Sequence, residues 1–367
     1  MSLVVGIVAF AGFLAAGVFY KLYRSQWFWG VVAIMLLLTA NLAKDPSYLS
    51  ITYSEATGRL VGNLIDILRW SAPIMLIAVG MVLVIATRGI DLSVGSAMVA
   101  GGATAMQYLS IVKAPDSVSA AVTAVLLAML TGLAIGAVNG LLVTYVGLQP
   151  FITTLVMMMA GRGIAKVITG GQNTAAENAP FKWLVNGTVA GFPVVFLIAI
   201  VIVGVLALFV RRTAFGMVVE SVGINPAASW MAGIRPNGIL LTVYLVSGML
   251  AAIGGVFSVG SVMVVDIAGT GYQSELDAIL AVVVGGTSLA GGKFSIRGAV
   301  IGALLIATLD KTVLLLGISG AATPAFKAVV IVLLCLLQSQ RVRTLFTQRR
   351  KADPAAPAEL PKASVAA

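Results

Sequence analysis

Eleven continuous apolar segments run along this chain of 367 residues, and they constrain its fold more than any other feature. Apolar residues make up 60% of the sequence and charged residues 10%, whereas a soluble domain carries roughly 25% charged residues. Such a chain cannot cover its own surface in water. Because the segments do not alternate between apolar and polar residues, they argue against a transmembrane β-barrel. The sequence therefore predicts an all-α, polytopic integral membrane protein.

The apolar segments predict about ten to eleven transmembrane helices. Segment 276–289 is shorter than the roughly 20 residues that a bilayer requires, and it leads into a glycine run, which indicates a broken or re-entrant element. We expect an extra span and a short basic loop in residues 1–26, a transmembrane domain in 27–340, and a basic, disordered cytoplasmic tail in 341–367. The expected spans are residues 3–20, 27–43, 71–87, 92–112, 118–145, 152–169, 191–210, 239–265, 276–289, 299–316 and 325–337.

The positions of Lys and Arg predict how the chain is oriented in the membrane. With the tail inside and the spans alternating, fourteen of the 23 basic residues lie inside. The outside then holds only Lys44, Arg59, Lys113 and Lys182. Basic residues collect on the cytoplasmic side of a membrane, so we expect the tail inside and, with eleven spans, the N-terminus outside. The net charge of +10 therefore reflects orientation in a lipid membrane and does not indicate a nucleic-acid partner.

Histidine is absent from the sequence, and Cys335 is its only cysteine. A disulfide within the chain is therefore impossible. Ser-His-Asp and Cys-His nucleophile systems and histidine-containing zinc sites are excluded as well. We expect no catalytic site, no metal site and no cofactor on this chain.

The segment from residue 211 to 238 predicts a short helix that is built to stop quickly. Asn225 is a good N-cap residue, Pro226 suits the first helical position, and Gly233 suits the left-handed residue that closes a helix. A helix of under two turns is marginal in water, so it must pack against something. Because Arg211 and Arg235 flank it, we expect it on the cytoplasmic side, as a docking element for another protein.

A second informative stretch, TRGIDLSVGSAMVAGG, runs from residue 87 to 102. It places Asp91 at the junction of two apolar segments, close to Ser93. A carboxylate at such a junction must face a polar cavity, a partner or the membrane interface. Two interpretations stay open. Asp91 pairs with Arg88 in a loop, or it belongs with Ser93 to a substrate pathway at a break between helices, where Ser93 can cap the second helix.

A third stretch, NGLLVTYVGLQPFITTL from residue 139 to 155, combines amide, aromatic and hydroxyl side chains. Asn139 lies deep in an apolar segment, where an unpaired amide is costly. Gln149, Phe151 and Thr153 follow at the start of the next segment. Together these groups suit a neutral polyhydroxyl solute such as a sugar, and we assign them to the same pathway. The alternative for each residue is a hydrogen bond between helices.

Glycines predict close packing and a surface turn. Gly132, Gly136 and Gly140 form a small-xxx-small pattern on one helix face, which is typical of close contact between membrane helices. The run GGTSLAGGK from residue 285 to 293 resembles a phosphate-binding loop, but it lacks the first glycine, and Phe294 stands where Ser or Thr is required. We therefore expect no ATP site here and interpret the run as a tight turn near the membrane surface.

Several motifs follow one another between residues 60 and 340: GIDLSVGS, NGLLV with LQPFITTL, ESVGINPAASWMAGI and ELDAILAVVVGGTSLAGGKFSIRG. This part of the chain resembles the sugar permease subunits of bacterial ATP-binding cassette (ABC) importers, which are related to branched-chain amino acid permeases. Within that group it is most similar to galactofuranose importer permeases, with ribose and xylose permeases as near neighbours. The resemblance implies the ABC importer permease fold and a place in the bacterial inner membrane. Segment 3–20 is extra relative to the family: it is an added span, or the true start lies near Trp27.

The resemblance also implies partners and roles. Two permease subunits, as a homodimer or a heterodimer, form the pore. A periplasmic binding protein delivers the sugar, and a cytoplasmic ABC ATPase subunit binds ATP and magnesium. This chain is then no enzyme, and it moves a monosaccharide inward by alternating access that the ATPase drives. The residues that the resemblance assigns to ATPase coupling are Glu220, Gly223, Asn225, Ala227, Ala228 and Gly233.

The alternative is an ion-coupled secondary transporter of a small polar solute. Asp91, Asp277 and Asp310 would then be membrane carboxylates that bind the ion. The short helix within residues 211–238 discriminates between the two interpretations, because a secondary carrier does not require it.

Overall fold

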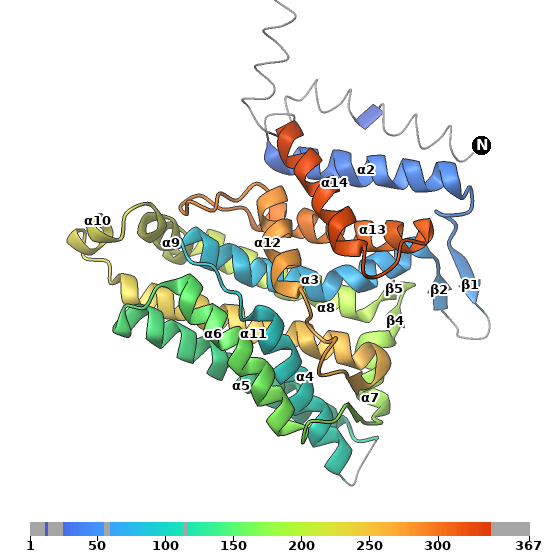
Figure 1. The fold of residues 1–367 in the computed structure, drawn as a ribbon, viewed down its shortest axis with the longest axis horizontal. Coiled ribbons are helices and arrows are strands. Elements are labelled where there is room, and N and C mark those ends of the chain that lie inside the picture. The colour runs from blue at the N-terminus through green and yellow to red at the C-terminus, as the bar shows by residue number, and fades with distance from the viewer. Residues whose placement is uncertain (1–11, 14–24, 55–58, 113–115, 339–367) are drawn as a thin grey trace, which may run out of the picture.

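The computed structural model describes residues 12–13, 25–54, 59–112 and 116–338, and it is predominantly helical, which confirms the predicted all-α class (Figure 1). The predicted tail, residues 341–367, and most of segment 1–26 lie outside the described residues. The helices are α2 (Gln26–Lys44), α3 (Asn63–Ala86), α4 (Val94–Ile111), α5 (Val118–Leu141), the π-helix η2 (Leu142–Val146), α6 (Pro150–Ile168), α7 (Ala179–Asn186), α8 (Val194–Arg212), α9 (Ala214–Ile224), α10 (Pro226–Met231), α11 (Pro236–Val262), α12 (Ser274–Val284), α13 (Ile296–Leu316) and α14 (Thr323–Gln338).

Three short antiparallel ribbons join these helices. The pairs are β1 (Thr52–Ser54) with β2 (Arg59–Val61), β3 (Thr174–Ala175) with β6 (Val264–Val265), and β4 (Thr188–Val189) with β5 (Phe192–Pro193). The ribbons β1–β2 and β4–β5 lie at one end of the bundle, at the right of Figure 1, whereas α10 projects at the opposite end.

Seven described helices are long and apolar enough to cross a membrane, compared with the ten to eleven spans that the sequence predicts. They are α2, α3, α5 together with η2, α6, α8, α11 and α13. Three further expected spans correspond to α4, α12 and α14, which do not meet the same criteria of length and composition. The expected span 3–20 lies outside the described residues. At 11 residues, α12 is a short element, as its sequence predicts.

The helices α4 and α12 both begin inside the bundle. A side chain on Gly95, at the start of α4, would overlap the carbonyl oxygen of Gly271, just before α12. Both glycines are buried. Helices that begin within the membrane are typical of transporters, where breaks of this kind lie close to the transport pathway.

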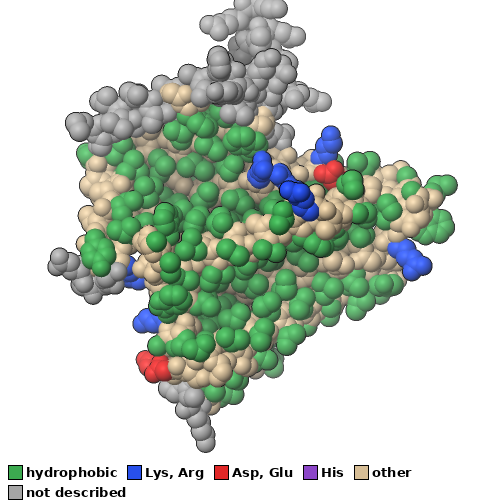
Figure 2. Space-filling view, turned by 180° about the vertical axis from the view of Figure 1, so that it is seen from behind, with side chains coloured by type: hydrophobic (Ala, Val, Ile, Leu, Met, Phe, Trp, Pro, Cys, Tyr) green, Lys and Arg blue, Asp and Glu red, His purple; other side chains and the backbone are tan. Residues whose placement is uncertain are grey.

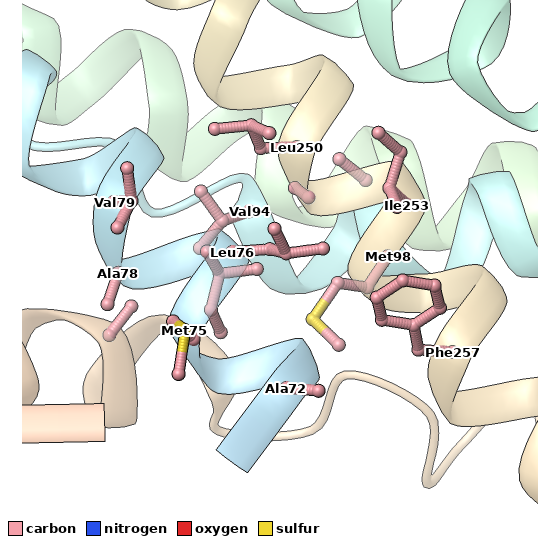
Figure 3. Packing of buried hydrophobic residues seen from close by; sticks show 14 of the residues in the cluster. Ala72, Met75, Leu76, Ala78, Val79, Val94, Met98, Leu250, Ile253 and Phe257 are labelled. Carbon is pink, nitrogen blue, oxygen red and sulfur yellow. The ribbon is translucent and has the colours of Figure 1, made fainter. Parts of the chain in front are cut away.

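The core is built around α3, whose second half is almost completely buried. Figure 3 shows Leu76 and Val79 of α3 facing Val94 of α4, with Met98 and Phe257 side by side between α4 and α11. The outer surface is also largely apolar in the view of Figure 2. An apolar interior together with an apolar exterior is the pattern of a helix bundle that lies in lipid.

The predicted glycine face of α5 packs directly on α11. A side chain on Gly132 or Gly136 would overlap the carbonyl oxygens of Gly248 and Tyr244. The two backbones therefore touch, which confirms the close helix contact that the spacing predicts.

The two ends of the bundle carry different loops and contacts. At one end the backbone N–H of Gly292 donates to the carbonyl of Ala86 (2.8 Å), and the Arg88 guanidinium donates to the carbonyl of Ile224. At the other end, Arg59 donates to the carbonyl of Asn186 (3.2 Å). We call the end that carries α9, α10 and Arg88 the cytoplasmic end, because the count of basic residues places it inside, and the opposite end the outer end.

Candidate functional site

The capped helix α10 forms as its sequence predicts. The Asn225 side chain accepts a hydrogen bond from the Ala228 backbone N–H (3.0 Å), and Pro226 opens the helix. Gly233 has φ +83° and closes the helix by donating its N–H to the carbonyl of Trp230 (2.9 Å). Trp230 and Met231 are 69% and 83% exposed, so α10 presents an apolar surface beyond the bundle. Ala227 and Ala228 are exposed beside them.

The preceding helix, α9, is fixed tightly to the bundle. Gly223 is buried, and a side chain there would overlap the carbonyl oxygen of Ala86 at the end of α3. Glu220 lines a groove of about 350 Å³ together with Arg211 and Phe294. The six residues assigned to coupling therefore divide into two groups: Glu220 and Gly223 face the bundle, whereas the other four lie exposed around α10.

Asp91 lies at the centre of a buried hydrogen-bond network, which we call the Asp91 network. Its carboxylate is 1% exposed and accepts from the Ser93 N–H (3.0 Å), the Ser93 hydroxyl (2.6 Å) and the Ser247 hydroxyl (2.8 Å). The Asn139 amide donates to the Ser93 hydroxyl (2.8 Å). The network therefore ties the start of α4 to α5 and α11.

This network bears on one of the two interpretations of Asp91, the pairing with Arg88, whereas a role of Asp91 and Ser93 in a substrate pathway stays a prediction. Asp91 does not pair with Arg88, whose side chain reaches Ile224. Ser93 occupies the N-cap position of α4, but its hydroxyl makes no capping bond and donates a hydrogen bond to Asp91 instead. The alternative given for Asn139, a hydrogen bond between helices, is the contact that the structure shows.

The other three pathway residues make no hydrogen bond with Asp91 among the described residues. Gln149 and Phe151 are exposed at the start of α6, and the buried Thr153 donates to the carbonyl of Gln149 (3.1 Å). The neighbouring Thr154 reaches the α3–α4 turn instead, by donating to the carbonyl of Ile90 (2.9 Å). A role for Gln149, Phe151 and Thr153 in a pathway stays a prediction.

A cavity of about 310 Å³ lies toward the outer end of the bundle and was not recognised as a site from the sequence. Small-molecule sites have volumes of about 300–1,000 Å³ and combine apolar walls with a few polar groups. Its polar lining residues come from α3, α11, α12 and α13 and are Arg69, Ser258, Ser261, Ser274, Asp277 and Asp310. Its apolar walls are Trp70, Pro73, Ile74, Ile77, Met98, Val185, Val195 and Phe257.

The charged groups at this cavity balance one another. Lys327 of α14 contacts both carboxylate oxygens of Asp277 (3.0 Å each) and one of Asp310 (2.8 Å). We call these three residues the Lys327 triad. Arg69 lies at the cavity wall, and its Nε atom is buried without a hydrogen-bond partner among the described residues. Lys327 does not line the cavity, but together with Arg69 it offsets the two carboxylates at the cavity wall, which suits a neutral, hydroxyl-rich solute.

Sequence reasoning named Asp277 and Asp310 only as ion ligands of the alternative transporter. In the structure, Lys327 already supplies the cation for both carboxylates. For Arg69 the sequence predicts no role. An ionisable residue within an apolar segment was the available signal, because such residues tend to face a cavity or a partner. Within the described part of the chain, no three His, Cys, Asp or Glu side chains come together in a way that could hold a metal ion.

Comparison with known proteins identifies the family. The sequence profile described as "branched-chain amino acid transport system / permease component" matches residues 63–337, which include every helix from α3 to α13. The chain belongs to this permease family. With seven apolar helices of spanning length, it is a multi-pass protein of the bacterial inner membrane.

Relatives that are named as sugar import permeases cover nearly the whole chain. It is 49% identical to the fructose import permease protein of Bifidobacterium longum, over 90% of this chain and 92% of the relative. It is 39% identical to the galactofuranose transporter permease protein of Escherichia coli (90% and 95%) and to the ribose import permease protein of Escherichia coli (85% and 93%).

The narrower expectation, that galactofuranose permeases are the most similar group, is wrong. The fructose permease is more similar, at 49% identity compared with 39%. No solved structure matches this chain.

Proposed function

We propose that this permease moves a neutral monosaccharide, of the ketohexose class to which fructose belongs, into the cytoplasm by alternating access. A periplasmic binding protein delivers the sugar, and a second permease subunit completes the pore. A cytoplasmic ABC ATPase, which holds ATP and magnesium, docks on α10 and drives the cycle. The similarity to a fructose permease supports the sugar class, and the charge-balanced cavity supports a neutral solute.

One observation carries the proposal: a single helix, α3, connects the cavity to the docking element. Arg69 and Trp70 of α3 line the cavity, and Ala86 at its other end contacts Gly223 of α9 and Gly292. A helix of 24 residues is about 36 Å long. A movement of α9 and α10 therefore reaches the cavity through one continuous helix, which suits a rigid-body transition.

The test is uptake of labelled sugars by proteoliposomes that contain the permease, its ATPase and its binding protein. We expect uptake that requires internal ATP hydrolysis, is fastest for fructose, and is unaffected when the proton gradient is collapsed. Uptake that persists with an ATPase unable to hydrolyse ATP, and that follows the proton gradient, would instead support an ion-coupled carrier.

A matched variant tests the docking role. Gly233→Trp places a bulky side chain on the exposed left-handed residue that ends α10, and such a residue is costly at φ +83°. We expect normal protein levels and a loss of ATP-driven uptake. Gly238→Trp is the control, because Gly238 is also exposed with nothing within 4 Å of an added Cβ, yet it lies within α11 with no positive φ. If Gly233→Trp takes up sugar as fast as the control Gly238→Trp and the parent, the result would argue against docking at α10.

A further inference from the structure

The turn after α3 holds a side chain in a backbone conformation that side chains normally avoid. Arg88 has φ +65°, in the left-handed region that is sparsely populated by residues other than glycine. Its N–H donates to the carbonyl of Ile85 (2.9 Å), and Gly89 donates to Val84 (3.0 Å), so the turn is held by its own hydrogen bonds. A residue persists in this region when its surroundings fix it there, and such residues are concentrated at functional sites.

The Arg88 side chain extends from this turn to the corner between α9 and α10. Its guanidinium donates to the carbonyl of Ile224, the last residue of α9. Asn225 follows directly and is the N-cap of α10. The stem of Arg88 crosses the glycine run after α12, where a side chain on Gly291 would overlap it. One side chain therefore spans the α3–α4 turn, the loop after α12 and the α9–α10 corner.

The backbones beneath Arg88 are in direct contact, but they are held together by few polar bonds. The Ala86 carbonyl accepts from the Gly292 N–H (2.8 Å), and Gly223 packs against the same oxygen. From α9 itself, the only hydrogen bond to the α3–α4 turn among the described residues is the one made by Arg88. Three residues further along is Asp91, whose network holds α4, α5 and α11.

We propose that Arg88 is a positioning residue of the transport cycle, which fastens the α9–α10 corner to the α3–α4 turn so that both move as one body. The inference rests on the proposed function, because it assumes that the ATPase acts on α10. With the hydrogen bond in place, a displacement of α10 is carried into α3 and the Asp91 network. Without it, α9 can slide over the glycine contact, so ATP is hydrolysed with little movement of the cavity.

Arg88→Gly is the decisive variant, because glycine accepts φ +65° without strain and removes only the side chain. We expect complex yield and melting temperature close to the parent's, since the relief of strain offsets the added freedom of the unfolded chain. The ATP hydrolysed per sugar transported should rise by about fivefold or more, in the usual range of coupling between sites. Arg88→Lys keeps a cationic donor on a long stem and should recover part of the coupling.

The measurement is the ratio of ATP hydrolysis to sugar uptake in the complete reconstituted transporter. Arg297→Ala is the control, because Arg297 is an exposed cation at the same end, on α13. A parent-like ratio for Arg88→Gly would overturn the inference, and so would a purely structural effect, in which hydrolysis, uptake and melting temperature fall together. If the parent transporter shows no ATP-dependent uptake, the proposed function fails and the inference fails with it.

Discussion

Two clusters of polar residues lie within this bundle, and they satisfy their carboxylates in opposite ways. In the Asp91 network, one carboxylate accepts only from hydroxyl and amide groups and is closed off from solvent. In the Lys327 triad, two carboxylates share one ammonium group, and both line an open cavity. The first arrangement fixes the positions of α4, α5 and α11. The second leaves two paired carboxylates at the wall of a cavity, where a solute can reach them.

The largest expected effect comes from removing the cation of the triad. Lys327→Met leaves Asp277 and Asp310 with no partner, and breaking a buried ion pair from one side costs about 3–5 kcal/mol. The side chains are 13%, 19% and 24% exposed, so solvent compensates only in part. We expect a clear loss of thermal stability in detergent, measured by the melting temperature of the purified protein.

Two controls sharpen this prediction. Lys293→Met removes an exposed lysine that makes no ion pair among the described residues, and it should leave the melting temperature unchanged. The triple variant Asp277→Asn, Asp310→Asn, Lys327→Met removes all three charges together and should recover much of the loss. If Lys327→Met alone has the melting temperature of the parent, the triad does not stabilise the fold. The contrast between the Lys327 triad and the Asp91 network is then wrong.

A smaller loss is expected in the Asp91 network. Asp91→Ala leaves the Ser247 hydroxyl without its acceptor, and an unsatisfied buried group costs about 1–3 kcal/mol. The Ser93 hydroxyl keeps a partner, because it still accepts from the Asn139 amide. Asp91→Asn keeps one acceptor oxygen, and the Ser247 hydroxyl can turn to accept from the new amide. The melting temperature should therefore fall clearly for Ala and little for Asn. An equally large fall for Asn would show that Asp91 needs its charge, and hence a cation that the hydroxyl network does not supply.

At the cavity, Arg69→Gln should affect transport more than stability. The buried Nε atom of Arg69 lies beside the cavity and has no hydrogen-bond partner in the described part of the chain. A hydrogen bond from a charged group contributes about 1.5–3 kcal/mol. We expect the KM for uptake to rise about tenfold or more, with basal ATP hydrolysis unchanged. Lys166→Gln, at an exposed cation away from the cavity, is the control. An unchanged KM would remove Arg69 from the binding site.

The smallest effect is expected for a second ion pair on the outer half of the bundle. Lys311 contacts Asp66 (2.6 Å) and lies over the Trp70 ring (4.6 Å to its centroid), but the Asp66 side chain is 41% exposed. An exposed pair contributes about 0.2–1 kcal/mol, so Lys311→Met should shift the melting temperature far less than Lys327→Met. A shift of the same size in both variants would mean that burial does not determine how much an ion pair contributes to the stability of this protein.

Local features of this protein were predictable because each depends on residues within a turn or two of one another. Asn225, Pro226 and Gly233 specify the start and end of α10 without help from the rest of the chain. The spacing of Gly132 and Gly136 indicates a face that a partner helix can approach. The family was identifiable for a related reason, since its motifs are continuous in sequence.

The cavity could not be predicted in this way, because its residues come from distant parts of the chain. Arg69 and Asp310 are 241 positions apart (310 − 69), and no local pattern relates them. The same holds for the partner of Asp91, which is Ser247 on α11. Gln149 and Phe151 have residue types that suit a sugar and lie exposed at the start of α6, and residue type alone does not indicate which cavity or surface they line.

The sequence by itself determined that this chain is a helical membrane protein with a capped helix at its cytoplasmic end. Capping depends on neighbouring residues, and apolar composition and the placement of basic residues are averages over segments. These features can therefore be read from the sequence without knowing which helices pack together. Only the tertiary structure decided which carboxylates are closed within the bundle and which line a cavity. That choice depends on the partner each charge finds after packing, and burying a charge is tolerated only where such a partner exists.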